Sequence, residues 1–462
     1  MKRRTRDKAP GVRLAYLVSH PIQYQAPLLR RLAAEPGIDL TVFFCSDVSV
    51  KKFVDPEFGE MIEWDVPLLE GYQSEFLPRF KETDGVSFWR PINYGLAKRL
   101  KAGRFDALWI HGYARWLHWV AMGMAKRQGV KVILRDEATL ISTQRGVAKR
   151  VVKRVFFRGL KMLCDGFLAI GTLNCQYYRQ QGIPQERIFP TPYAVDNAFF
   201  QNQAATATAT REDLRRSLGL DSRRPVILYA GKLIARKRPG DLLEAYIRLS
   251  PDGRREPHPY LLFIGDGDLR QDLEQRVGKC GWTSIKFLGF HNQTELPRYY
   301  NLCDVFVLPS VHEPWGLVVN EVMNAGRAVI VSDQVGCGPD LVKDGENGYI
   351  FSAGKVDSLS EVLAKALNNP QQCRAMGQRS LAIIQNWSFA EDICGLKQAL
   401  AYVLGRDEIK SEAGFSRGDA GCSSSAGLRN YRETEASLAR EKSLPQVSAT
   451  PAFCQRGVNS ED

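Results

Sequence analysis

The sequence predicts an α/β protein with two doubly wound parallel-sheet domains that face each other across a cleft. Short apolar runs alternate with helical segments over residues 11–200, and the same alternation resumes after residue 222. Apolar runs separated by helices are typical of strands that are buried on both faces of a parallel sheet. At 462 residues the chain is also too long for one ordinary hydrophobic core.

Ten apolar segments are the expected strands. In the first half they cover residues 12–18, 40–45, 107–110, 130–134 and 166–170. In the second half they cover residues 226–230, 260–264, 285–288, 305–308 and 328–331. Ligands of such domains bind at the carboxyl ends of the strands, in the crevice between the domains. The residues that follow the strands are therefore the first candidates for a site.

The ends of the chain and its middle differ from the rest in composition. Residues 1–10 are basic and form an expected solvated arm. Residues 201–222 begin with QNQAATATAT and are the expected linker between domains over residues 11–200 and 223–385. Residues 386–405 contain a helix with apolar periodicity. Residues 406–462 are rich in Ser, Gly, Ala, Arg and Glu, so we expect a disordered tail.

The overall charge and the cysteines limit the class of protein. A formal net charge of +12 indicates an anionic partner such as a phosphorylated substrate, an acidic membrane surface or nucleic acid. The ten cysteines are scattered singly, which argues against a zinc site or a disulfide framework and favours a reducing compartment. No apolar run approaches the roughly 20 residues that span a bilayer. We expect a cytoplasmic protein, with peripheral contact to the cytoplasmic membrane face at most.

Residues 310–323, SVHEPWGLVVNEVM, follow an expected strand and carry two glutamates eight residues apart. Pro314 is suited to the first turn of a helix, whose N–H groups and dipole would point at the cleft and attract phosphate. Glu313 would lie before this helix and Glu321 inside it, roughly 12 Å further along if all eight steps are helical. A single glutamate is more often an exposed loop or helix residue, but this pair at a strand end favours a site for sugar hydroxyls.

A basic turn and two histidines follow other strands. Residues 231–239, GKLIARKRP, offer Lys232 and Lys237 to a diphosphate, although basic surface turns are common. His111 ends the strand at 107–110 and could polarise a reacting group, or it could be an ordinary buried histidine. His20 closes the first strand, where the same two interpretations apply.

The motif at residues 265–268, Gly-Asp-Gly-Asp, has two interpretations. Its two carboxylates could hold a divalent metal, but a turn that closes the preceding strand is the better interpretation. Arg270 stands where the dinucleotide fingerprint requires a third glycine, which argues against a nicotinamide dehydrogenase.

Residues 145–162, RGVAKRVVKRVFFRGLKM, predict a basic amphipathic helix with Val147, Val151, Val155 and Phe156 on its apolar face. Such a helix could rest on an anionic bilayer, or it could pack on the first sheet with its charges in solvent. The two interpretations are compatible.

These motifs together resemble glycosyltransferase family 4, a group of retaining enzymes with the GT-B fold of two Rossmann-like domains. The resemblance covers most of residues 11–404 and is strongest at the spacing of Glu313 and Glu321. Residues 192–200 (PYAVDNAFF), 231–239, 264–267 (IGDG) and 346–351 (ENGYIF) support it. It implies that the first domain serves the acceptor, that the second binds the nucleotide sugar, and that the helix after residue 386 returns to the first domain.

The resemblance also implies roles for single residues. Glu321 would hold the nucleotide ribose, and Glu313 and His111 would lie at the donor sugar. Lys232 and Lys237 would contact the diphosphate, and the backbone of Gly316, Leu317 and Val318 would serve the sugar and phosphates. Two departures concern Lys232, where the family often has arginine, and residues 19–25 (SHPIQYQ), which replace a glycine-rich acceptor loop.

The implied activity is transfer of a sugar from a nucleoside diphosphate sugar to an acceptor hydroxyl, with retention and without a metal or other cofactor. The leaving phosphate itself would accept the proton. The expected acceptor is a saccharide or a lipid-linked intermediate of polysaccharide, lipopolysaccharide or glycolipid synthesis. One alternative is a nucleotide-sugar epimerase on the same fold. Another, suggested by the charge alone, is a nucleic-acid-binding protein, although no aromatic residues are interleaved with the basic runs as in known RNA motifs.

Overall fold

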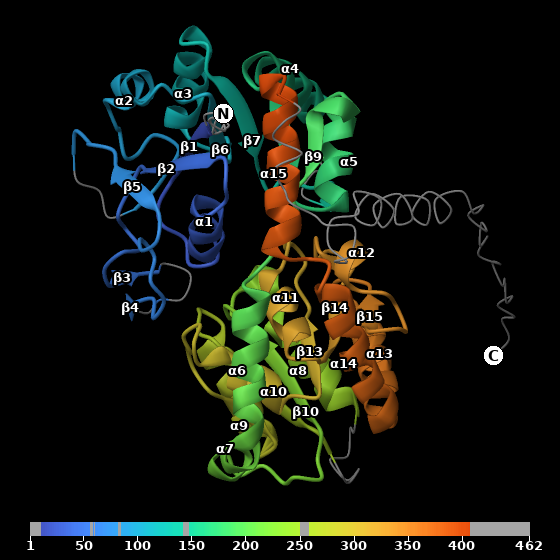
Figure 1. The fold of residues 1–462 in the computed structure, drawn as a ribbon. Coiled ribbons are helices and arrows are strands. Elements are labelled where there is room, and N and C mark those ends of the chain that lie inside the picture. The colour runs from blue at the N-terminus through green and yellow to red at the C-terminus, as the bar shows by residue number, and fades with distance from the viewer. Residues whose placement is uncertain are drawn as a thin grey trace, which may run out of the picture.

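Two parallel sheets form the core of the protein in the computed structural model, which describes residues 11–55, 59, 61–81, 85–141, 147–249 and 258–406. The first sheet has seven strands in the order β5-β2-β1-β6-β7-β8-β9, and the second has six in the order β12-β11-β10-β13-β14-β15. The two sheets lie in separate domains, one above the other in Figure 1. The predicted fold class is thus confirmed. The expected basic arm at residues 1–10 and the expected tail after residue 406 lie outside the described residues.

The strands of the first sheet alternate their side chains between two apolar cores. In β1, Leu14 and Tyr16 pack into one core, whereas Ala15 and Leu17 pack into the other. Both cores are closed because helices cover both faces of a parallel sheet. The strands are β1 (Val12–Val18), β2 (Ile38–Phe44), β5 (Gln73–Phe76), β6 (Ala107–His111), β7 (Lys131–Arg135), β8 (Gly166–Ala169) and β9 (Ile188–Pro190). A separate antiparallel pair, β3 (Phe53–Val54) and β4 (Met61–Ile62), lies outside this sheet.

The second sheet is built in the same way. Val226 and Leu228 of its central strand face one core, and Ile227 and Tyr229 face the other. Its strands are β10 (Val226–Ala230), β11 (Tyr260–Ile264), β12 (Ile285–Phe287), β13 (Val305–Leu308), β14 (Ala328–Ser332) and β15 (Gly348–Phe351).

Helices connect the strands of both sheets. In the first domain they are α1 (Ala26–Ala33), α2 (Leu96–Gly103), α3 (Trp116–Arg127), α4 (Val147–Leu163) and α5 (Thr172–Gln180). In the second they are α8 (Pro239–Leu249), α9 (Arg270–Cys280), α10 (Leu296–Leu302), α11 (Leu317–Asn324), α12 (Gly338–Leu341), α13 (Val356–Asn368) and α14 (Pro370–Ile384).

The segment expected as a polar linker is largely helical. Residues 201–209 belong to α6 (Asn197–Ala209), and α7 (Arg211–Ser217) follows directly. Asp196 caps α6 by accepting a hydrogen bond from the backbone N–H of Phe199, and alanine is the strongest helix former. Phe200 and Ala204 are buried in the second domain, so α6 is packed structure and not a flexible tether.

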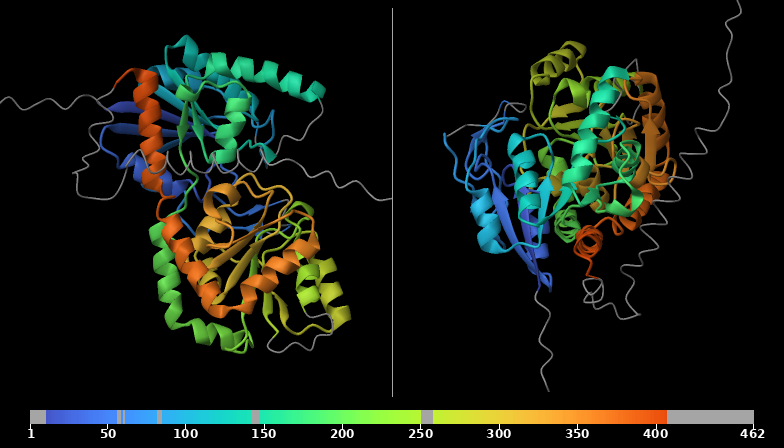
Figure 2. Two further views of the ribbon diagram at one scale, coloured as in Figure 1. Left: turned by 90° about the vertical axis from the view of Figure 1, so that its right-hand side faces the viewer. Right: turned by 90° about the horizontal axis from the view of Figure 1, so that it is seen from above.

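The last helix, α15 (Phe389–Leu404), leaves the second domain and packs on the first sheet. Figures 1 and 2 show it beside the first domain, whereas α13 and α14 stay with the second. A capping box of Ser388 and Glu391 starts the helix. Asp392 in its first turn binds Arg135 at the end of β7 at 2.9 Å, and both side chains are buried. The chain therefore crosses between the domains twice, at α6 and at α15.

Candidate functional site

A cavity of about 480 Å³ lies between the two domains, at the carboxyl ends of the strands of both sheets. We call it the cleft cavity. Of the candidates predicted from the sequence, it is lined by His20, Lys232, Lys237, Glu313, Gly316, Leu317, Val318 and Glu321. His111 is not among the lining residues.

The backbone of Glu313 is held in place by hydrogen bonds to a second loop, at residues 334–336. Its backbone N–H donates to the carbonyl of Gln334 at 3.1 Å, and its carbonyl accepts from the N–H of Gly336 at 2.9 Å. A side chain at Gly336 would collide with the backbone of Pro314, since a Cβ there would lie 1.9 Å from the Pro314 carbonyl oxygen. The position of the glutamate thus depends on a close approach of two backbones that glycine permits.

The helix between the glutamates begins later than Pro314, where we expected its first turn. It begins at Leu317, after Gly316, whose φ of 100° is a left-handed conformation that favours glycine. The estimate of roughly 12 Å between the glutamates assumed a continuous helix, and this assumption is wrong because Glu313 lies four residues before the helix. The first-turn N–H groups at Leu317 and Val318 lie in the cavity wall, where they lack partners within the helix and suit an anion.

Glu321 lies in the second turn of α11 and accepts a hydrogen bond of 2.6 Å from the hydroxyl of Tyr300. Burial raises the pKa of Glu321 to about 7, although the bond from Tyr300 acts in the opposite direction. The carboxyl group therefore changes charge near neutral pH. As a carboxylate it can accept hydrogen bonds from two neighbouring hydroxyls.

Both predicted lysines are paired with carboxylates in the cleft. Lys237 forms an ion pair with Glu313, and both side chains are largely buried. Lys232 contacts both carboxylate oxygens of Asp55, at 2.9 and 3.1 Å, and so joins the second domain to the first. A diphosphate in the cavity would have to share or replace these carboxylates.

The glycines of residues 264–267 allow two turns to pack together. A Cβ on Gly265 would lie 2.0 Å from the carbonyl oxygen of Gly231, and one on Gly267 would lie 2.6 Å from that of Leu233. Asp266 forms an ion pair with Arg270 and accepts from the N–H of Gly267. These contacts agree with a turn, and no cluster of three or more metal-ligating side chains occurs among the described residues.

His20 faces the cavity from the first domain and is a neutral imidazole at pH 7. Burial lowers its pKa to about 4, with further lowering by the charges of Arg115 and His111. Its Nδ1 lies 2.8 Å from the hydroxyl of Ser19. His20 can therefore donate or accept one hydrogen bond without carrying charge.

His111 lies behind the cavity wall, in a network of polar side chains. Its Nε2 is 3.3 Å from the hydroxyl of Tyr193 and 3.9 Å from a carboxylate oxygen of Glu137. Burial opposes ionisation of Glu137, but His111, Tyr193 and Arg135 together hold its pKa below the usual value. The hydroxyl of Tyr24, which does line the cavity, reaches Glu137 at 3.4 Å. In this structure His111 borders the cavity only through these neighbours.

Sequence reasoning missed several residues of the cavity. Tyr24, Asp55, His291 and Tyr300 line it, yet none of them was a candidate. Tyr24 and His291 lie in segments that follow expected strands, at residues 19–25 and 289–291, so position alone could have indicated them. Asp55 and Tyr300 carried no signal, because only folding brings them to the strand ends.

The first domain carries a separate apolar surface of six exposed side chains, which we call the aromatic surface. Trp89 is 61% exposed and Trp116 50% exposed, and their rings lie 5.6 Å apart. Its members are Phe80, Phe88, Trp89, Ile92, Tyr94 and Trp116. Large contiguous apolar patches on soluble proteins are typical of surfaces that contact a partner or a bilayer.

The basic helix predicted over residues 145–162 is α4, which is described from residue 147. Phe157 and Leu160 face inward and are fully buried, whereas Val155 is exposed, contrary to the expected apolar face. Val155, Met162 and the basic residues Arg154 and Arg158 are exposed together. No helix among the described residues has the length and apolar character required to cross a bilayer.

The fold and the cleft define a two-domain protein of the GT-B class, with a nucleotide-sized cavity between Rossmann-like domains. Comparison of the structure with solved structures supports this fold. HepE from Anabaena, solved with UDP and glucose, has a TM-score of 0.63 at 18% identity, covering 83% of this chain and 97% of that chain. The lipopolysaccharide outer core galactosyltransferase WaaB has a TM-score of 0.57 at 14% identity, covering 86% of this chain and 100% of that chain.

Residues 210–381, which include most of the second domain, match the model of the family "Glycosyl transferases group 1". Alpha-D-kanosaminyltransferase from Streptomyces kanamyceticus is 29% identical over 203 residues, 44% of this chain and 50% of that protein. O-antigen chain mannosyltransferase B from Escherichia coli is 31% identical over 180 residues, 38% of this chain and 45% of that protein. The chain thus matches half or less of the length of these relatives.

Proposed function

We propose that the protein is a retaining glycosyltransferase that moves a sugar from a nucleoside diphosphate sugar to an acceptor hydroxyl. The observation that carries this proposal is the content of the cleft cavity. Glu313, Glu321, Lys232, Lys237 and the start of α11 all line a volume of about 480 Å³. Cavities of roughly 300–1,000 Å³ hold ligands of nucleotide size.

The roles follow from the chemistry of each side chain. Glu321 accepts hydrogen bonds from the ribose hydroxyls, and the first turn of α11 and the two lysines hold the diphosphate. Glu313 lies beside Lys237 and contacts the donor sugar. During transfer the bond from the anomeric carbon to the phosphate oxygen breaks, and the acceptor oxygen attacks the same face. The acceptor proton passes to the leaving phosphate oxygen, whose charge the lysines balance.

The aromatic surface supports an acceptor at a membrane. Arg115, directly before Trp116, lies close enough to His20 for its charge to lower the pKa of that histidine. The surface therefore lies near the acceptor side of the cleft cavity. Tryptophan and tyrosine favour the bilayer interface, and cations such as Arg154 and Arg158 on α4 favour anionic headgroups. A lipid-linked acceptor at the cytoplasmic membrane face fits these features.

The proposal is tested first by donor binding. We expect at least one nucleotide sugar among UDP-, GDP- and ADP-sugars to raise the melting temperature of the full chain. No shift with any of them would count heavily against a glycosyltransferase. Incubation with that nucleotide sugar alone distinguishes a transferase from an epimerase. An epimerase would convert the sugar, whereas a transferase would at most hydrolyse it slowly.

Variants of the two glutamates test the site itself. Glu321→Ala should weaken donor binding about tenfold or more, because the ribose loses a charged acceptor. Glu313→Ala should mainly lower kcat. The matched control is Glu361→Ala, an exposed glutamate on α13, which should change neither quantity. If both site variants keep the activity of the wild type, the assignment of the cavity is wrong.

A further inference from the structure

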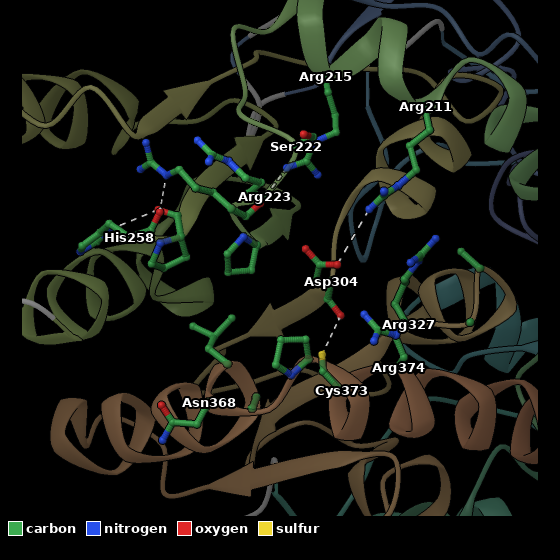
Figure 3. A pocket seen from close by; sticks show the side chains of 18 of the residues that line it. Arg211, Arg215, Ser222, Arg223, His258, Asp304, Arg327, Asn368, Cys373 and Arg374 are labelled. Atoms are coloured by element: carbon green, nitrogen blue, oxygen red, sulfur yellow. Dashed lines mark hydrogen bonds and ion pairs between the residues drawn. The ribbon is translucent and has the colours of Figure 1, made fainter. Parts of the chain in front are cut away.

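A second and larger cavity, of about 790 Å³, lies at the amino ends of the strands of the second sheet, whereas the cleft cavity lies at their carboxyl ends. We call it the basic pocket, and Figure 3 shows its side chains from close by. Its walls come from the segments that precede β10, β11, β13 and β14, and from α7, α13 and α14. Six arginines line it: Arg211, Arg215, Arg223, Arg224, Arg327 and Arg374. The one carboxylate among its described lining residues is Asp304.

Three of the arginines fix the backbone at the starts of the strands. Arg215 is buried and donates to the carbonyls of Asp221 and Arg224, at 2.6 and 2.7 Å. Arg211 donates to the carbonyls of Asn301 and Leu302. Arg224 donates to the carbonyl of His258. Carbonyls satisfy the N–H groups of a guanidinium but do not neutralise its charge. Arg211 also lies 3.8 Å from carboxylates of Asp304 and Glu212, and Arg223 lies 3.1 Å from that of Asp221. The other four arginines form no ion pair among the described residues, which leaves the pocket positive.

Arg327 and Arg374 provide cations that the protein itself does not use. Among the described residues, neither has a carboxylate within ion-pair distance, and the Nε of Arg327 is buried without a hydrogen-bond partner. Burial lowers the pKa of Arg327 and the charge of Arg211 adds to this, whereas the carboxylate of Asp304 acts in the opposite direction. Leaving a buried donor without a partner destabilises the protein, more so when the donor is charged, and a bound anion would remove that penalty.

We propose that the basic pocket binds a soluble small molecule that carries two or more phosphate charges. Guanidinium groups match phosphate oxygens in pairs, and several arginines that converge on one cavity are typical of phosphate recognition. The volume of about 790 Å³ exceeds that of a single phosphate, and Leu249, Leu367 and Leu381 add an apolar wall for the rest of the molecule. The site is separate from the cleft cavity, because the two lie at opposite ends of the same strands.

The test is calorimetric titration of inorganic pyrophosphate into the full chain at fixed ionic strength. The Lys232→Ala/Lys237→Ala background removes the two lysines of the cleft cavity, so that binding there does not mask the pocket. We expect this background to bind about one pyrophosphate, and the added changes Arg327→Gln and Arg374→Gln to weaken that binding at least tenfold. Because Arg374 is exposed, its replacement should leave the fold intact, and Arg374→Gln alone should already show part of the loss.

The matched control removes two arginines of the same domain that lie outside the pocket, Arg276 and Arg379. An equal loss in Arg276→Gln/Arg379→Gln would mean that pyrophosphate responds only to net charge and would overturn the proposal, as would the absence of binding in the background. Sedimentation with phosphatidylglycerol vesicles tests whether the pocket binds the phosphate of lipid headgroups instead. Arg327→Gln/Arg374→Gln should sediment as the wild type does, and a loss of sedimentation would assign the pocket to lipid headgroups.

Discussion

At the scale of single residues, three charged side chains in the cleft cavity already have partners that a ligand must replace or join. Lys237 is paired with Glu313, Lys232 with Asp55, and Glu321 with the hydroxyl of Tyr300. The first two pairs neutralise charge in the empty cavity. The third leaves Glu321 with a raised pKa, because a hydroxyl provides no positive charge. The charge of Glu321 therefore depends on pH near neutrality.

Donor affinity should rise with pH through about 7 if the carboxylate form of Glu321 holds the ribose. The fraction ionised increases about tenfold from pH 6 to pH 8 for a group with this pKa, so the dissociation constant should fall by up to about tenfold. A nucleoside diphosphate sugar is the correct probe, since its diphosphate does not titrate in this range. Titration at four pH values measures the effect.

The control for this pH dependence is Glu321→Gln, which keeps the shape of the side chain but cannot ionise. Its donor affinity should be nearly constant over the same range. The stability of the ligand-free protein should change in the opposite direction. Because the folded pKa exceeds the unfolded value, the folded state holds the extra proton, and stability falls as the pH rises from about 4.5 to 7. If donor affinity depends on pH in the same way in the wild type and in Glu321→Gln, Glu321 does not have the proposed role.

Sequence alone predicts side chains at strand ends, but it does not predict their partners. Lys232 and Glu321 were recognisable because each belongs to a motif after an apolar run. Asp55 lies 177 residues from Lys232, and Tyr300 lies 21 residues before Glu321. Neither pairing has a local pattern, because each arises when separate elements meet at the cleft. The placement of His111 behind the wall has the same origin.

At the scale of elements, the central strands were predictable, whereas three of the four edge strands, β5, β9 and β15, were not. β1, β10, β11 and β13 match their expected ranges, because strands buried on both faces consist of apolar residues throughout. The edge strand β5, with sequence QSEF, is largely exposed and carries no such pattern. α6 was mistaken for a linker because its alanines and threonines lack apolar periodicity, although alanine favours helix.

The attachment of α15 to the first domain depends on the buried pair of Arg135 and Asp392. Arg135→Met should lower the free energy of unfolding by about 3–5 kcal/mol, because it leaves Asp392 buried without its cation. The double variant Arg135→Met/Asp392→Leu should recover most of that loss. Urea unfolding measures all three proteins.

Arg379→Met is the control for this series, because Arg379 forms an exposed pair with Glu346 at 3.4 Å on α14. Exposed pairs contribute at most about 1 kcal/mol, so this variant should stay close to the wild type. If Arg135→Met also stays within that limit, the buried pair does not hold the helix to the sheet.

At the scale of the whole molecule, the aromatic surface and the outer face of α4 give the first domain an amphipathic exterior. The full chain should sediment with vesicles that contain phosphatidylglycerol and much less with neutral vesicles, since both apolar contact and positive charge contribute. Trp89→Ser/Trp116→Ser should reduce this binding several-fold without changing donor affinity. The control is Tyr402, an exposed aromatic residue of α15 whose ring packs on Phe189. Tyr402→Ser should bind vesicles as the wild type does. Equal vesicle binding by Trp89→Ser/Trp116→Ser and by Tyr402→Ser would exclude the aromatic surface as the membrane contact.

The two domains are also joined across the opening of the cleft, where residues near the β3–β4 pair reach the second domain. Asp55 binds Lys232, and Asp65 accepts hydrogen bonds from the backbone and hydroxyl of Thr294. Only the first of these contacts occupies a group that we propose for the donor diphosphate. On that proposal, donor binding separates Lys232 from Asp55 or shares the lysine between two anions.

Asp55→Asn should tighten donor binding by about fivefold, because a partly buried ion pair that competes with the diphosphate contributes about 1 kcal/mol. Asp65→Asn removes the same charge from the same segment but leaves the lysine paired, so donor affinity should change less than twofold. Calorimetric titration of the donor into each variant distinguishes the two effects. Weaker binding by Asp55→Asn would mean that Asp55 stabilises the closed arrangement of the domains more than it competes for Lys232. In that case the contact between the domains would be part of the donor site and not a rival to the donor.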